Sequence, residues 1–442
     1  MLKTLINAFK VKEIRHKVYM MLLLLLVFRI GCFIPVPGLV RTEFTTLFGE
    51  GGNDFLTMMS GITGGALSQG TLFALGIGPY INASIIMQLL GVGIPALERL
   101  SKQGEEGRKK IAQYTRYLTI VLAIIQSVGI IISFANNSNA IDTQFFGGEG
   151  MEWLAGIFMS LMYTAGALLV MWLGERITDY GVGNGQSMII FVGILATAGN
   201  SILGEIEKLG GADTAKTIWG LVAFVLVAIV IFFAIIYVDL SERRVPVQYA
   251  KQIKGRKMYG GQSSNIPIRI SGGGVMPLIF AFSILSFPQL IGSMINNGDN
   301  AFSEWWATWM SGSSDLEWGV VIYSLVLCVL IFAFSFFYAQ MQFNPEDVSK
   351  SIQQNGGFIQ GIRPGKATEN YLKKISNRIT LFGAIYLSLI AFIPSVAFAA
   401  ANLNLVNVFS TTGILIVVSC AMEFEKQLQA QLMMKNYKGF LK

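Results

Sequence analysis

The sequence VYMMLLLLLVFRIGCFI, residues 18–34, decides the fold class of the chain. Its length is close to the roughly 20 apolar residues that a helix needs to cross a bilayer. A basic segment, residues 1–17, comes before it, and the motif IPVPG follows at residues 34–38, where a cleavable signal peptide would end in small residues. We therefore expect a retained first transmembrane helix.

Nine more stretches of this kind follow along the chain. Of the 442 residues, 53% are apolar and only 13% are charged, whereas soluble domains are nearer a quarter charged. A chain so poor in charge has to keep most of its surface away from water. The sequence therefore predicts an all-α membrane protein with ten transmembrane helices, at about residues 18–34, 71–93, 115–135, 153–173, 182–203, 217–238, 274–295, 319–340, 377–398 and 406–424.

The lysines and arginines predict which way the chain faces. Ten spans put both termini on one side of the membrane, and all but four of the 33 basic residues fall in the tails and loops of that side. Basic loops stay in the cytosol. We expect a multi-pass protein of the cell membrane with both termini cytosolic. Residues 1–17, in which Leu2, Leu5, Ile6 and Phe9 share one helical face, predict an amphipathic helix on the membrane surface.

Several classes of protein are disfavoured by what the sequence lacks. It has one histidine, His16, and its three cysteines lie in apolar runs without a C-x-x-C pair, which argues against a disulfide framework, a zinc site and histidine catalysis. Its acidic residues avoid the middle of the spans, unlike those of most ion-coupled carriers. We expect neither an enzyme nor a cofactor. A small-molecule carrier remains the main alternative to a channel, and a membrane-embedded enzyme is the third.

Residues 55–68, FLTMMSGITGGALS, are apolar, rich in glycine and too short to span a bilayer. They fall on the outer side, where an apolar segment has to be covered. Irregular backbone at membrane depth is tolerated only against protein or a water-filled cavity. The segment is either a re-entrant half-helix inside a pore or an interfacial loop covered by neighbouring helices.

The second predicted span carries polar side chains. Ser84 and Gln88 lie one turn apart on one face, and amides inside a bilayer usually face other helices. Ordinary helix packing explains them, and so does a pair of helices that separates and closes again.

Two of the predicted cytosolic loops are long and basic. The first, residues 239–273, predicts a β-hairpin. The second, residues 341–378, predicts a helix that begins after Asn344-Pro345 and ends before two glycines, followed by GIRPGK at residues 361–366. Topology signals and contact with anionic lipids require fewer charges than these loops carry. Their size favours a docking platform for a large partner.

The chain resembles a known family over nearly its whole length. The matching motifs are VFRIG (27–31), IPVPG (34–38), GGALS (64–68), FALGI (73–77), PYI (79–81), GRKKIAQYTRY (107–117), MWLGE (171–175), GNG (183–185), RRVPV (243–247), GVMP (274–277), FNP (343–345) and GIRPG (361–365). In this order they resemble the SecY family, the channel subunits of the bacterial protein-export translocon.

The resemblance implies a passive pore that conducts unfolded secretory polypeptides and releases hydrophobic segments sideways into lipid. Two inverted five-helix halves, residues 1–211 and 212–442, would surround an hourglass pore, and helices 2 and 7 would part as a lateral gate. Residues 55–68 would be the plug. The implied partners are SecE and SecG, the motor ATPase SecA, the ribosome and polypeptides that bear signal sequences.

The resemblance also implies roles for particular residues. The implied pore ring is Ile81, Ile190, Ile279 and Ile416; the plug includes Thr57, Ser60, Gly61, Gly64, Gly65 and Leu67; the lateral gate includes Asn82, Gln88, Gln126 and Ser283; docking falls on Arg243, Arg244, Lys251, Arg256, Arg363, Pro364, Gly365, Lys366 and Tyr437. One motif departs from the family, because STTG at residues 410–413 stands where Gly-Gly-Thr-Ser is usual.

Overall fold

The computed structural model describes most of the chain. The described residues are 2–40, 60–61, 63–137, 152–207, 214–249, 252–254, 257–259, 263–270, 274, 276–295, 305, 309, 317–400 and 411–439. The predictions made for Thr57, Lys251 and Arg256, and for the side chain of Tyr437, lie outside this set.

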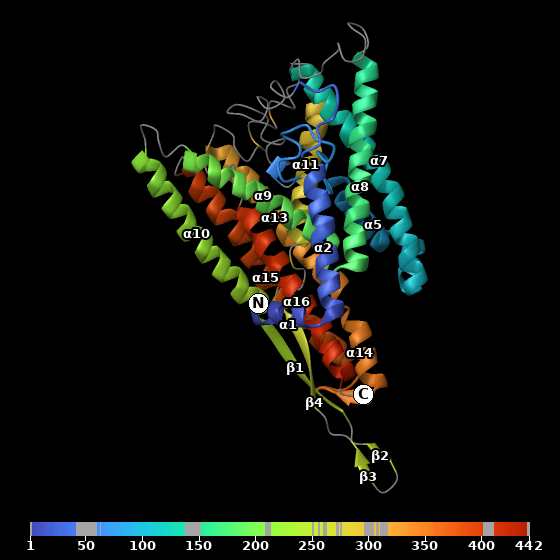
Figure 1. Cartoon of the computed structure of the whole chain (residues 1–442). Coiled ribbons are helices and arrows are strands. Elements are labelled where there is room, and N and C mark those ends of the chain that lie inside the picture. Colours follow the sequence, from blue (N-terminus) through green and yellow to red (C-terminus); the bar gives the residue numbers. More distant parts are fainter. Residues whose placement is uncertain are drawn as a thin grey trace.

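Long helices packed side by side form the body of the molecule (Figure 1). The helices are α1 (Leu2–Lys10), α2 (Lys12–Gly31), α5 (Gly78–Gly93), α6 (Pro95–Lys102), α7 (Glu105–Asn137), α8 (Glu152–Tyr180), α9 (Gly185–Glu207), α10 (Thr214–Leu240), α11 (Met276–Ile295), α13 (Glu317–Gln342), α14 (Pro345–Gln354), α15 (Lys366–Ala400) and α16 (Thr411–Gly439). Each stretch that the sequence predicts as a span overlaps one of these helices.

Length and composition single out some of these helices as membrane spans. Within the described residues, four helical stretches are long and apolar enough to cross a bilayer: Glu105–Ile132, Trp153–Tyr180, Val321–Gln354 and Lys366–Ile393. A fifth arises if α5 and α6, which meet at a bend of 101°, count as one broken span. Shorter apolar helices lie within α9, α10 and α11. The prediction of ten spans stays a prediction.

Two differences from the sequence prediction have a clear local cause. The span predicted from residue 71 is a series of turns up to residue 77, because Gly76 takes a positive φ of 53° and Pro79 starts the helix afresh at the first turn of α5. The single helix predicted for residues 1–17 is wrong, since the backbone at Val11 is extended and Lys12 already belongs to α2.

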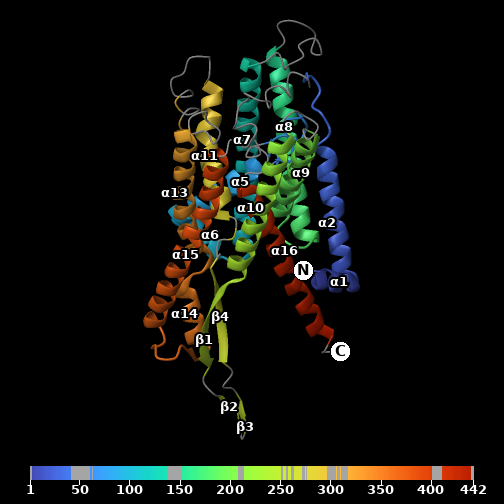
Figure 2. The same cartoon turned by 90° about the vertical axis from the view of Figure 1, so that its left-hand side faces the viewer.

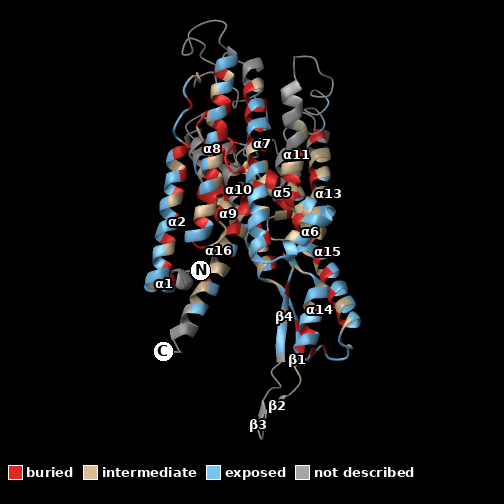
Figure 3. Cartoon of the chain, turned by 90° about the vertical axis from the view of Figure 1, so that its right-hand side faces the viewer, coloured by how far each residue is buried: buried red, intermediate tan, exposed pale blue. Residues whose placement is uncertain are grey.

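The core follows from the pairing of helices. The packed pairs include α13 with α15, α5 with α7, α7 with α8, and α16 with both α9 and α10. The outward faces keep apolar side chains, such as Leu22, Leu26 and Ile30 of α2, each more than half exposed. Figure 3 shows such exposed stripes along the outside of the bundle. These apolar faces can contact lipid without a free-energy penalty, whereas their contact with water would be unfavourable.

A small sheet projects from one end of the bundle (Figure 1). Strand β1 (Glu242–Tyr249) pairs antiparallel with β4 (Ser263–Arg269), and β2 (Gln252–Lys254) pairs with β3 (Lys257–Tyr259) at the tip. The predicted hairpin is confirmed. The short strand β5 (Gly357–Phe358) adds to the other side of β1, giving the order β4-β1-β5. The two long basic loops therefore share one sheet.

Close backbone packing in the bundle can be tested at Gly166 of α8. A Cβ at this position would overlap the carbonyl of Leu72. We expect Gly166→Ala to lower the free energy of unfolding by about 1–3 kcal/mol, the usual cost of overpacking. The measurement is the midpoint of thermal unfolding of the purified protein in mild detergent.

The matched control is Gly156→Ala on the same helix. Its Cβ would meet only Ile131 Cγ2, at an ordinary 3.8 Å, so the midpoint should hardly move. Equal midpoints for the two variants would show that α8 does not approach residue 72 as described.

Candidate functional site

The four isoleucines of the implied pore ring come from four different helices. Ile81 lies on α5, Ile190 on α9, Ile279 on α11 and Ile416 on α16. Ile190 and Ile416 are buried, and Ile81 and Ile279 are half-buried against the same apolar cluster. Side chains separated by more than 300 positions in the sequence are thus gathered into one apolar region.

Hydrogen bonds fix where α9 begins and therefore where Ile190 lies. The backbone N–H of Gly185 donates to Thr178 Oγ1 at 2.9 Å, and that of Gln186 donates to Asn184 Oδ1 at 3.1 Å. A Cβ at Gly185 would overlap the carbonyl of Gly174 in α8. Gly185 is needed here because the join between α8 and α9 leaves no room for a Cβ at this position, and Gly183 suits the join because its φ of 96° would strain a side chain.

The described residues between 60 and 70, which are 60–61 and 63–70, form a compact body inside the bundle. Leu67 is fully buried and packs in a cluster with Leu75 and Tyr163, while Ala66 belongs to the same cluster as the four isoleucines. Protein therefore covers the described part of the apolar segment, residues 60–61 and 63–68, as both interpretations of the segment require. Of the two alternatives for residues 55–68, the half-helix does not extend over residues 64–68, which form turns because Gly64 and Gly65 both take a positive φ.

The implied gate residues lie on three helices that pack against one another. Asn82 and Gln88 lie on α5, Gln126 on α7 and Ser283 on α11, and α11 contacts both α5 and α7. Asn82 and Gln126 are buried, whereas Gln88 and Ser283 are half-buried. The predicted Ser84–Gln88 pair is confirmed, since Gln88 Nε2 donates to Ser84 Oγ at 3.2 Å.

Gln126 holds an unsatisfied polar atom. Its Oε1 is buried and has no hydrogen-bond partner among the described residues. Such an atom costs free energy in the packed arrangement. The interface of α7 with its neighbours is thus weaker than an apolar one of the same shape.

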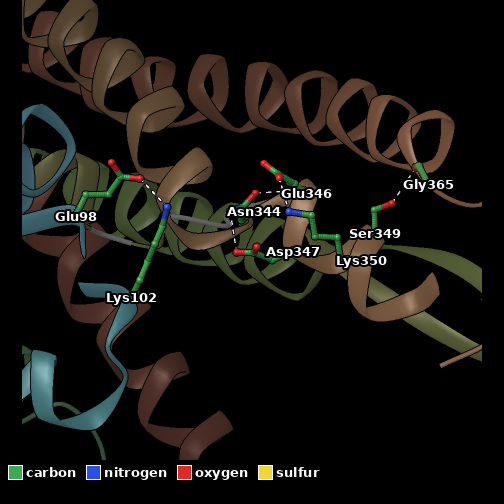
Figure 4. Close-up of polar contacts among 8 residues, drawn as sticks. All are labelled: Glu98, Lys102, Asn344, Glu346, Asp347, Ser349, Lys350 and Gly365. Atoms are coloured by element: carbon green, nitrogen blue, oxygen red, sulfur yellow. Dashed lines mark hydrogen bonds and ion pairs between the residues drawn. The ribbon is translucent and has the colours of Figure 1, made fainter. Parts of the chain in front are cut away.

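The loop that carries Arg363 is held from both sides. Ser349 Oγ of α14 donates to the carbonyl of Gly365 at 2.9 Å (Figure 4). On the other side, Thr368 Oγ1 of α15 donates to the carbonyl of Arg363 at 2.9 Å. Gly365 has a φ of 101°, which a side chain would strain. Arg363, Pro364 and Lys366 are left exposed on a rigid turn.

Helix α14 starts where the sequence predicts. The Asn344 side chain accepts a hydrogen bond from the N–H of Glu346 at 3.1 Å and donates to Asp347 Oδ2 at 2.8 Å. The hydrogen bond from Lys350 lowers the pKa of Glu346. These contacts, drawn in Figure 4, hold the first turn of the helix together.

Helix α6 lies within electrostatic reach of this turn. The hydrogen bond to Glu98 is the main cause of the raised pKa of Lys102, and the charges of Asp347 and Glu346 raise it further. The 101° bend after α5 therefore carries a charged helix towards α14.

The remaining implied docking residues lie on the sheet. Arg243 and Arg244 are exposed on β1, and Arg244 Nε contacts Glu242 Oε1 at 2.7 Å. Val245, Val247 and Ile268 of the hairpin share a small apolar core with Ile352 and Leu372 of the second loop. Sequence reasoning missed this union of the two loops, because a two-residue strand such as β5 leaves no periodic signal.

Taken together, the helical bundle, the buried glycine-rich segment and the basic platform define a multi-pass membrane protein of the translocation-channel class. A family model described as SecY matches residues 71–425. The protein translocase subunit SecY of Streptomyces coelicolor is 40% identical, with 100% of both chains covered. The chain belongs to the SecY family of protein-translocation channels.

Solved channels share the fold. One, from a study titled "The plug domain of the SecY protein stablizes the closed state of the translocation channel and maintains a membrane seal", has a TM-score of 0.67 at 21% identity and covers 94% of this chain and 92% of its own. The Sec61 of the canine ribosome-channel complex has a TM-score of 0.62 at 18% identity, with the same two coverages.

Family membership decides between the alternatives left by the sequence. The chain is a multi-pass protein of the cell membrane and a channel for protein translocation, not an enzyme. The small-molecule carrier and the membrane-embedded enzyme are therefore set aside.

The cap of α14 gives a local test of the platform. Asn344→Ala removes the side-chain acceptor, a loss of about 1 kcal/mol, so amides in the first turn of α14 should exchange hydrogen about fivefold faster. Asn344→Ser keeps an oxygen acceptor and should exchange nearly as the parent does. Hydrogen exchange of both variants is measured by mass spectrometry. If the serine variant exchanged as fast as the alanine variant, the side chain of residue 344 would not act as the cap.

Proposed function

We propose that this chain forms a passive pore through which unfolded secretory polypeptides cross the membrane, with Ile81, Ile190, Ile279 and Ile416 as its constriction. The gathering of these four side chains from α5, α9, α11 and α16 into one apolar region carries the proposal. Water leaves a narrow apolar neck, and an ion cannot pass without its hydration shell. The neck can still widen around a peptide.

In this proposal the segment around residues 57–68 is the plug, a second barrier beside the constriction. Its support is the buried, protein-covered position of Ala66 and Leu67. A solved relative is described as having a plug domain that maintains a membrane seal. The segment would move aside when a polypeptide enters.

The two halves of the proposed channel are residues 1–211 and 212–442. Helices α5 and α7 of the first half meet α11 of the second, and opening this contact would release hydrophobic segments sideways into lipid. The unsatisfied Gln126 Oε1 of α7 supports this assignment, because a helix with a buried unsatisfied atom separates from the neighbours that bury it at lower cost.

The sheet and α14 would dock the partner that drives transport. Figure 2 shows α1 and the C-terminal part of α16 at the same end of the bundle as this platform. An even number of spans gives that arrangement, and the positive-inside rule puts this end in the cytosol. The exposed Arg243, Arg363 and Lys366 suit the motor ATPase SecA or a translating ribosome, and a solved relative is a ribosome-channel complex.

Further partners are part of the same proposal. SecE and SecG would complete the translocon around the exposed apolar helix faces. Polypeptides with signal sequences would be the substrates, and anionic lipids would contact the basic loops.

The seal is tested by resting ion current in planar bilayers. Replacing Ile81 and Ile190 together with serine puts hydroxyls into the apolar region, so that water stays and ions pass. We expect single-channel current without substrate to rise well above that of the parent. A control with the same chemistry is Leu89→Ser with Leu195→Ser, which changes exposed side chains on the same two helices.

The control should stay electrically silent. If the isoleucine variant is equally silent while still folded and assembled, these side chains do not form the constriction.

Docking is tested by reversing one charge on the rigid turn. Arg363→Glu should reduce ATP-driven transport of a secretory precursor into membrane vesicles by about tenfold or more, since like charges across an interface repel. Lys373→Glu, an equal reversal at an exposed position of α15, should transport nearly normally. Normal transport by Arg363→Glu membranes would exclude this turn from the docking surface.

A further inference from the structure

Arg29 is a charged side chain within the apolar stretch of α2. Ionisable residues in such stretches are costly and usually serve a function with a specific partner. Arg29 is half-buried, its Nη1 donates to the carbonyl of Gly64 at 3.3 Å, and its guanidinium lies 5.5 Å from the centre of the Phe33 ring. The charge therefore points at the backbone of the compact body formed by residues 60–70.

A second helix, α9, holds the same body at Gly61, three residues before Gly64. Thr197 Oγ1 of α9 donates to the carbonyl of Gly61 at 3.0 Å and also contacts the carbonyl of Gly193 at 3.3 Å. Two carbonyls of residues 60–70 thus receive donors from α2 and α9. In a low-dielectric interior a hydrogen bond from a charged donor is stronger than a neutral one.

Gly64 fits closely between the two helices. A Cβ on this residue would lie 2.7 Å from Arg29 Nη1 and 3.0 Å from Gly193 Cα. The neighbouring Gly65 has a similar backbone, with a φ of 81° against 76°, but its Cβ would meet only Ser68 Oγ at 3.9 Å. The tight approach is therefore specific to Gly64.

The body is also held together internally. The N–H of Gly65 donates to the carbonyl of Ser60 at 2.9 Å, and the N–H of Ser68 donates to Ser60 Oγ at 3.3 Å. A segment closed on itself in this way can move as a unit once its outside attachments are released.

We propose that Arg29 and Thr197 form a latch that holds residues 60–70 in place, with Arg29 as the positioning residue that has to release Gly64 before the segment moves. The latch determines the position of the segment. Its effect on ion flow rests on the proposed function, in which this segment is the plug.

The test reads the position of the segment directly. Gly61→Cys supplies a probe, because a Cβ there meets nothing within 4 Å, and the three native cysteines are replaced by alanine. The assembled translocon is placed in liposomes, and the rate of labelling by a membrane-impermeant maleimide is measured beside the resting ion current.

Three changes should release the segment. Arg29→Leu, Thr197→Val and Gly64→Ala are each expected to speed labelling, Arg29→Leu by roughly tenfold, the factor expected when a hydrogen bond to a charged group is lost. Arg29→Lys keeps a charged donor and should label more slowly than Arg29→Leu. Gly65→Ala is the matched control, with the same backbone strain but no contact with the latch, and should label more slowly than Gly64→Ala.

The outcomes separate the latch from the plug. Faster labelling with a higher resting current supports both. Faster labelling with an unchanged current supports the latch and overturns the assignment of the segment as the plug. Unchanged labelling in the Arg29, Thr197 and Gly64 variants overturns the latch, whatever the current of the isoleucine variants.

Discussion

Lipid accepts no hydrogen bond from a peptide group, so any stretch of backbone that is neither helix nor paired strand at membrane depth has to find its partners in the protein. Residues 60–77 meet this demand with turns, with the hydroxyls of Ser60 and Thr63, and with donors from α2 and α9. The glycines among them let the chain turn in little space. Helices α2 and α9 supply donors to this segment, and α8 packs against it.

In the proposed function, the same segment brings together the features on which translocation would depend. Ala66 joins the apolar cluster of the four isoleucines, and Leu67 lies in the neighbouring cluster with Tyr163 of α8. A seal made of side-chain packing can open and close without a chemical step. What controls it, in our proposal, is a small number of hydrogen bonds whose loss costs little against the binding of a long polypeptide.

The basic platform, made of the sheet, α14 and the turn at Gly365, would solve a different problem. In the proposed docking role it has to transmit force. It gains rigidity because β5 completes the sheet of β1 and β4 and because Ile352 and Leu372 fill the core beneath the hairpin. The turn at Gly365 is tied to both α14 and α15. Exposed arginines on such a frame keep their geometry when a partner binds, so less conformational entropy is lost.

The sequence by itself determined the helices, the hairpin, the start of α14 at Asn344 and the family, because these depend on local periodicity, capping and motif order. It did not determine that residues 71–77 are turns, that residues 1–17 divide at Val11, or that the two basic loops share one sheet. Nor did it show that Arg29 and Thr197 donate to two carbonyls of one segment, those of Gly64 and Gly61. Only the tertiary structure decided these points, because contacts between residues far apart in the chain depend on how helices pack, and packing leaves no period in the sequence.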